Sequence, residues 1–143
     1  MESKKIRIKI VSEKYDDAPK PERSEMMTEA ELVREGGKTR IEYSESEITG
    51  MDGAKTIISF ADNAPSFVTM ERHGGGFSMS FAFEKGKQHS SLYRTPIMTF
   101  DMSVLANEVQ NRLAVAGYIL LDYTLDIGGA GASRNRVYVS IMK

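Results

Sequence analysis

Two charged residues on neighbouring predicted strands are the strongest candidates for binding chemistry. In the segment 38–48, Tyr43 and Glu45 occupy one face of a β-strand, because side chains alternate between its two faces. Arg72 lies on the apolar face of the segment 66–73. A Glu45–Arg72 pair would form a charge-assisted contact that could hold the polar head of a ligand. The same residues could instead form an internal ion pair, or remain two solvated charges at a strand end.

A second group of polar side chains lies in the segment 88–95. Tyr93 and Thr95 follow two serines there, and hydroxyl groups that converge inside a protein suit a polar ligand or ordered water. Alternatively, this strand is exposed on both faces, or the loop 15–23 covers it. Together with the charged pair, these residues form the candidate ligand-binding set of Tyr43, Glu45, Arg72, Tyr93 and Thr95.

Catalytic and metal sites find little support in the sequence. The chain has two histidines, His73 and His89, and no cysteine, so a metal site would need carboxylates to complete it. The glycine-rich segment 128–131 is followed by a predicted strand rather than by the helix that a dinucleotide-binding loop requires. We therefore predict no catalytic residue, no metal and no cofactor. An enzyme that uses Glu45 and Arg72 for acid–base chemistry is the least favoured function.

The composition describes a small soluble chain with balanced charge. The 143 residues include 19 Lys+Arg and 20 Asp+Glu, which gives a formal net charge of −1. This balance argues against binding to nucleic acid or to an anionic membrane through charge. The lack of cysteine excludes disulfides, and no apolar run is long enough to span a membrane. The N-terminus has no apolar signal core, so we predict a cytoplasmic protein.

Alternation of apolar and polar residues is the dominant pattern of the chain. Ile6, Ile8 and Ile10 alternate with charged residues, which predicts a half-buried strand at the N-terminus. The proline-rich, charged segment 12–24 is predicted to be an exposed loop. The further predicted strands are 25–34, 38–48, 54–61, 66–73, 77–84, 88–95, 97–105, 117–127 and 134–142.

About eight to ten short antiparallel strands favour a closed barrel or a sandwich over an open sheet, whose long edges would invite aggregation. We therefore predict an all-β chain with a single domain over residues 1–143. The segment 102–116 is ambiguous, because its apolar residues recur at helical spacings of three and four. The same segment also fits a strand, a turn and another strand.

Several short segments, taken in their order and spacing, resemble the YwiB-like family of bacterial proteins, a domain of unknown function. The resemblance implies a calycin-like, lipocalin-like barrel, and strands rather than a long helix in 102–116. The chain departs from the family at Ile97-Met98, and it lacks the tryptophan of the lipocalin signature, so no lipocalin ligand is carried over. The similar segments are Tyr43 to Glu45, Thr49-Gly50, Lys55-Thr56, Met70 to Gly74, Phe83 to Gly86, Tyr93 to Pro96 and Gly117 to Tyr123.

These observations favour a non-enzymatic barrel that binds a small apolar or amphipathic molecule in its interior. The possible Glu45–Arg72 anchor and an inner face rich in methionine and phenylalanine support this hypothesis. The barrel could instead be filled by its own side chains. In that case the alternative is a protein–protein interaction module, which could be a homodimer.

Overall fold

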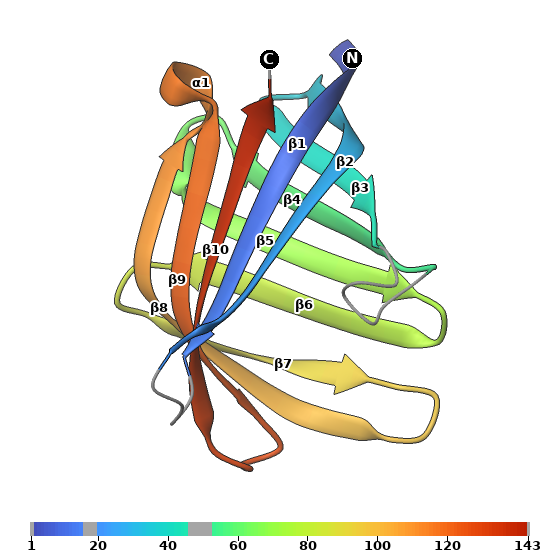
Figure 1. Ribbon diagram of the computed structural model, residues 1–143, viewed down its shortest axis with the longest axis vertical. Helices are drawn as coiled ribbons and strands as arrows, with labels where there is room; N and C mark the ends of the chain where they lie inside the picture. Colours follow the sequence, from blue (N-terminus) through green and yellow to red (C-terminus); the bar gives the residue numbers. More distant parts are fainter. Residues whose placement is uncertain (1, 16–19, 46–52, 143) are drawn as a thin grey trace.

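The computed structural model describes residues 2–15, 20–45 and 53–142, and these residues form ten strands and one short helix (Figure 1). The elements are β1 (Glu2–Tyr15), β2 (Glu22–Glu35), β3 (Lys38–Ser44), β4 (Lys55–Ala61), β5 (Ala64–Gly74), β6 (Phe77–Glu84), β7 (Gln88–Arg94), β8 (Thr99–Arg112), α1 (Leu113–Ala116), β9 (Tyr118–Ile127) and β10 (Ala132–Met142).

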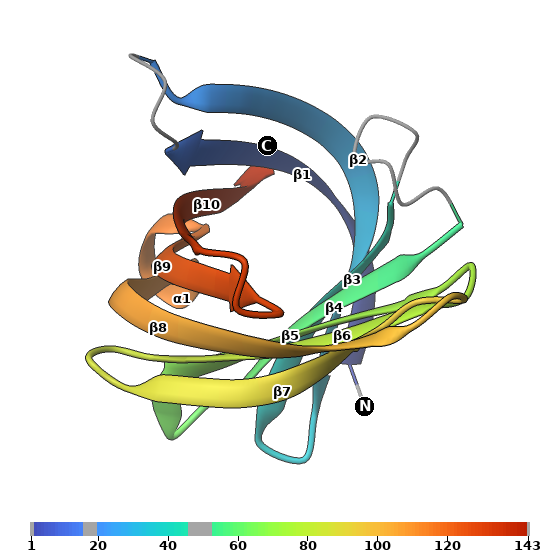
Figure 2. The ribbon, with the colours of Figure 1, turned by 90° about the horizontal axis from the view of Figure 1, so that it is seen from below.

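The strands close into one antiparallel barrel, which confirms the predicted fold class. Each strand pairs with the strand that follows it in the chain, and β10 pairs with β1 to complete the ring. This closing pair, which we call the seam, extends from Arg7–Met142 to Tyr15–Arg134. Seen from below, the strands surround a central axis (Figure 2). In the described residues β6 and β7 pair at a single position, Ser78–Arg94, whereas the other neighbouring strands pair over longer stretches.

The inward faces of the strands form the hydrophobic core. Ile6, Ile8 and Ile10 are buried on β1, as their alternation predicted. The same alternation buries Phe81 and Phe83 on β6. The core is one continuous cluster to which nearly every strand contributes. The sequence pattern therefore gives the correct inner face wherever the alternation is unbroken.

The predicted exposed loop 12–24 is too long at both ends. β1 continues to Tyr15 and β2 begins at Glu22, and the two strands remain paired from Lys14–Glu22 onward. A β-hairpin can carry charged residues on its outer face while its backbone hydrogen bonds remain intact. The high density of charge therefore did not indicate where the strands end. The centre of the predicted loop, 16–19, lies outside the described residues.

The ambiguous segment 102–116 is mostly strand. β8 extends to Arg112, and α1 is a single turn that ends at Ala116 and is capped by Gly117. A β-bulge between Ala106 and Glu108 places one extra residue, Asn107, in the strand. The bulge shifts the inward positions by one residue, so Val109 follows Ala106 toward the core, whereas Leu105 of the helix-like spacing faces outward. Within the described part of the chain, no helix is long and apolar enough to cross a membrane.

Candidate functional site

The structure brings together the residues of the predicted charged pair. Tyr43, Thr56 and Arg72 are directly opposite one another on β3, β4 and β5, so they form one row on the inner face. Glu45 follows β3, and its Oε1 lies 3.4 Å from Nε of Arg72. The hydroxyl of Thr56 donates a hydrogen bond to the same oxygen of Glu45. We call these four residues the inner polar cluster.

Burial dominates the electrostatics of the inner polar cluster. The Glu45 side chain is 1% exposed and that of Arg72 is 23% exposed. Burial raises the pKa of Tyr43 to about 12, although the nearby positive charge of Arg72 acts in the opposite direction. Burial likewise raises the pKa of Tyr123, which also lies near Arg72. The tyrosines are therefore neutral at ordinary pH, and the Glu45–Arg72 pair has no net charge.

Tyr93 and Thr95 lie apart from the inner polar cluster. The Tyr93 ring is 6.4 Å from that of Phe77 and 6.1 Å from that of Phe100, so it packs in an aromatic group. Thr95 begins the β7–β8 turn, where its hydroxyl donates to the carbonyl of Met98 and accepts from two backbone N–H groups. Among the described residues, no hydrogen bond, ion pair or ring contact joins either side chain to Glu45 or Arg72.

The middle of the barrel is filled by its own side chains. Ile8, Ile41, Ile58, Phe83 and Leu121 have no exposed surface, and they come from strands on all sides of the ring. Protein interiors of this kind pack as densely as organic crystals, so a ligand could enter only by displacing them. The packing favours the filled barrel that the sequence left open as an alternative.

A groove of about 890 Å³ crosses the outer wall of the barrel over β2, β1, β10, β9 and β8. Its apolar part is formed by Val11, Tyr118, Leu120 and Tyr138. The rings of Tyr118 and Tyr138 stack with their centres 5.1 Å apart. The volume lies in the range of small-molecule sites. We call this feature the outer groove.

One feature of the sequence indicates the outer groove, although the predicted site lay inside the barrel. From Tyr118 to Leu121 the chain is apolar at every position, whereas a strand with one wet face alternates. Ile119 and Leu121 fill the core, which leaves Tyr118 and Leu120 on the outside. A continuous apolar run on a barrel strand therefore indicates apolar side chains on the outer face as well as in the core.

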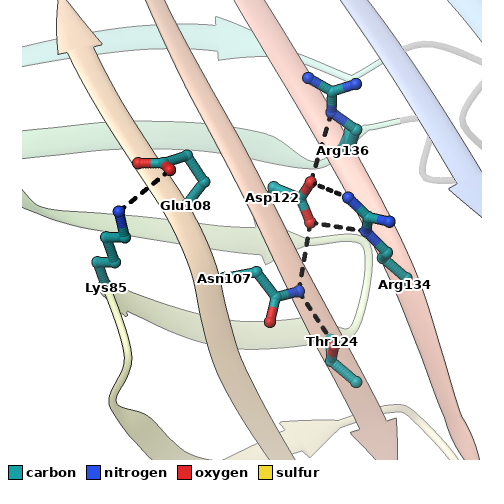
Figure 3. Close-up of polar contacts among 7 residues, drawn as sticks. All are labelled: Lys85, Asn107, Glu108, Asp122, Thr124, Arg134 and Arg136. Atoms are coloured by element: carbon teal, nitrogen blue, oxygen red, sulfur yellow. Dashed lines mark hydrogen bonds and ion pairs between the residues drawn. The ribbon is translucent and has the colours of Figure 1, made fainter.

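One end of the outer groove rests on a network of polar side chains around Asp122, which is 5% exposed (Figure 3). Arg134 donates to both carboxylate oxygens, from Nε at 3.1 Å and from Nη2 at 2.7 Å. Asn107, the extra residue of the β8 bulge, donates to Oδ1 at 3.3 Å. Nε of Arg136 lies 3.5 Å from Oδ2. The hydrogen bonds from Arg134 hold the pKa of Asp122 below its usual range.

The two histidines lie in separate surroundings. His89 has its Nε2 3.7 Å from Oε1 of Glu84 and packs edge-on against Phe67. His73 is on β5, opposite Lys55 and Ser78. Over the ranges that the structure describes, no three side chains of the metal-binding types gather into a possible metal site.

Comparison with known proteins gives a family and a fold. A family model described as "Domain of unknown function (DUF1934)" matches residues 8–139. The crystal structure of ywiB protein from Bacillus subtilis is similar over 99% of this chain and 94% of that chain, with a TM-score of 0.75 and 16% sequence identity. A search of curated proteins returned no match. These findings confirm the predicted resemblance to the YwiB-like family.

Proposed function

The chain belongs to the family described as a domain of unknown function, DUF1934, and from that premise we propose that it is a non-enzymatic binding protein that holds a small amphipathic molecule in the outer groove. One observation carries this proposal: a groove with a stacked tyrosine pair lies on the outside of a barrel whose interior is filled. The groove combines this aromatic and aliphatic surface with polar and charged side chains, and polar groups beside apolar surface fix the orientation of a ligand in small-molecule sites.

The proposal moves the ligand from the interior, where the sequence placed it, to the outer wall. In the inner polar cluster, Arg72 already faces Glu45, and Thr56 satisfies the carboxylate further. A guanidinium that already faces a buried carboxylate offers an incoming anion no surplus charge. Tyr43, Glu45 and Arg72 therefore fit a structural role better than a ligand anchor, and Thr95 fits a turn. The lack of cysteine is compatible with a cytoplasmic location, which stays a prediction.

A second candidate function is the interaction module, including a homodimer. The β7–β8 turn exposes Ile97 at 92% and Met98 at 54%, and the hydroxyl of Thr95 holds the turn in place. A fixed apolar turn loses little entropy when a protein partner binds it. Native mass spectrometry of the purified protein separates the two candidates. A small-molecule adduct favours the groove, and a dimer without an adduct favours the interaction module.

The groove is tested directly with the neutral fluorescent probe N-phenyl-1-naphthylamine. We expect its emission to rise on binding, and Tyr138→Ala to weaken binding about two- to tenfold, because a stacked aromatic contact contributes about 0.5–1.5 kcal/mol. Tyr138→Phe keeps the ring and should bind like the wild type. The measurement is a fluorescence titration, with circular dichroism to show that each variant is folded.

Ile97→Ser is the matched control, because Ile97 is a fully exposed apolar side chain outside the groove. It should leave the titration unchanged. If Tyr138→Ala and Ile97→Ser behave alike, or if the probe does not bind the wild type, the groove is not the binding surface and the proposal fails.

A further inference from the structure

The geometry points to Arg136 as an anion receptor in the outer groove, and we infer that the ligand is an aromatic molecule carrying a phosphate or carboxylate group. The inference rests on the proposed function, because it assigns the chemistry of a ligand to the same groove. It adds a charged group and a spacing that the apolar surface alone does not specify.

The carboxylate of Asp122 is already satisfied. It receives two hydrogen bonds from Arg134 and one from Asn107. The paired contact from Arg134 is bidentate, the strongest geometry between an arginine and a carboxylate. Asp122 is buried and Arg134 is in contact with it, so each offsets the charge of the other.

Arg136 approaches the same carboxylate but forms no hydrogen bond with it. Only its Nε faces Asp122, at 3.5 Å, and this buried nitrogen has no hydrogen-bond partner among the described residues. Its two terminal nitrogens point away from Asp122 (Figure 3). In the part of the chain that the structure describes, no hydrogen bond or ion pair engages them. They form a planar pair of donors, which suits phosphate or carboxylate oxygens.

The charges of the groove and of its ion pairs do not cancel. Lys9 and Arg23 share the carboxylate of Glu25, at 3.6 and 2.8 Å. Glu13 is the carboxylate that lines the groove, and it is opposite both Arg23 and Arg136 in the ladders. In this set the positive side chains outnumber the negative ones by one. The positive side chains are Lys9, Arg23, Arg134 and Arg136, and the negative ones are Glu13, Glu25 and Asp122. A single positive charge is left to attract an anion.

The guanidinium of Arg136 lies close to the aromatic surface of the groove. Arg136 and Tyr138 are two residues apart on β10, and both line the groove. This spacing places their Cα atoms about 7 Å apart on one face of the strand. A ring stacked on Tyr138 could therefore direct an attached anionic group toward Arg136. The ring alone would contact only Tyr138, and the anionic group alone would contact only Arg136.

The test uses phenyl phosphate, with phenol and inorganic phosphate as its two halves, in titrations followed by two-dimensional amide NMR. We expect phenyl phosphate to shift the signals of β1, β9 and β10 around the groove and to bind more tightly than either half. Arg136→Gln should weaken its binding at least about tenfold, because charge-assisted hydrogen bonds are lost. Arg136→Lys keeps the charge but not the planar donor pair, and should lose less.

Arg40→Gln is the matched control. Arg40 is 37% exposed and Arg136 is 38% exposed, and both contact a carboxylate, but Arg40 lies on β3 away from the groove. The inference is overturned if the Arg40 and Arg136 variants bind phenyl phosphate alike, or if inorganic phosphate binds as tightly as phenyl phosphate. If the neutral naphthylamine binds and phenyl phosphate does not, the inference fails while the proposed function stands. If neither molecule binds, both fail.

Discussion

At the scale of single residues, the inner polar cluster shows why a buried charge need not be a binding site. Glu45 is almost fully buried and has two partners, Arg72 and Thr56. Removing one member of a buried ion pair leaves the other without compensation, whereas removing both can cost little. The pair therefore favours one arrangement of β3, β4 and β5, and this role requires no ligand.

This structural role predicts a strongly coupled double-mutant cycle. Arg72→Met should reduce the free energy of unfolding by about 2–4 kcal/mol, because it leaves the Glu45 carboxylate buried and unpaired. We place the loss below the largest known values because the Arg72 side chain is 23% exposed. Adding Glu45→Gln to Arg72→Met should recover part of the loss, which gives a coupling energy of about 1–3 kcal/mol. Urea-induced unfolding measures each corner of the cycle.

The same variants also serve the question of function. If the inner polar cluster is structural, the folded double variant should bind the naphthylamine probe like the wild type. Additive losses in the cycle would show that the two charges act separately and would contradict the structural role.

At the scale of elements, one glycine fixes the strand end that carries Arg72. Gly74 ends β5 with a φ of +122°, and a Cβ atom there would lie 2.8 Å from the carbonyl oxygen of Gly53 and 3.1 Å from Cα of Ala54. Ala54 in turn accepts a backbone hydrogen bond from Glu45 at 2.8 Å. The close approach at Gly74 therefore sets how the ends of β3, β4 and β5 meet.

Gly74→Ala should destabilise the barrel more than the same change at an ordinary turn. Its methyl group would collide with backbone atoms that cannot rotate away, so we expect a loss of about 2–4 kcal/mol. Gly86→Ala is the matched control, because Gly86 has a φ of +79° but no atom within 4 Å of a built Cβ. It should lose about 1–2 kcal/mol from backbone strain alone. Equal losses in urea-induced unfolding would show that the contact is unimportant.

Elements were predictable from the sequence wherever alternation was unbroken. The N-terminal strand and β6 followed from their period of two, and Glu45 and Arg72 were placed on the correct face for the same reason. β8 was not predictable as one strand, because the extra residue Asn107 shifts its inward positions. The same bulge directs the side chain of Asn107 to Asp122. Because the sequence did not predict the bulge, it also did not predict this hydrogen bond.

The candidate site was harder to predict than the fold. Alternation identifies which residues share a face, but it does not say whether the interior of a barrel is open or filled. Tyr118, Arg136 and Tyr138 meet only because β9 and β10 pair in one particular register. The sequence also does not show that the hydroxyl of Thr95 bonds within the β7–β8 turn, so its place in the binding set stays a prediction.

At the scale of the whole molecule, the seam joins the two ends of the chain. β1 and β10 pair from Arg7–Met142 to Tyr15–Arg134, and Ile8 and Val139 bring fully buried side chains to the core there. Pairing of segments distant in the sequence costs loop-closure entropy, which is compensated only when the side-chain contacts and hydrogen bonds between them have formed. The outer groove crosses this seam, since Val11 comes from β1 and Tyr138 from β10. Whether the groove is preformed is thus a question about the stability of the seam.

We expect the seam to open only when the whole barrel unfolds. Ile8 and Val139 are as deeply buried as Val68 and Phe83, so the seam contributes to the same packed core as β5 and β6. Native-state hydrogen exchange should therefore give the amides of β1 and β10 the same opening free energy as those of β5 and β6. Amides in the exposed β7–β8 turn serve as the control and should exchange at a much lower free energy. Exchange of the seam amides at that lower level would show that the seam opens while the rest of the barrel stays folded, which would contradict the prediction.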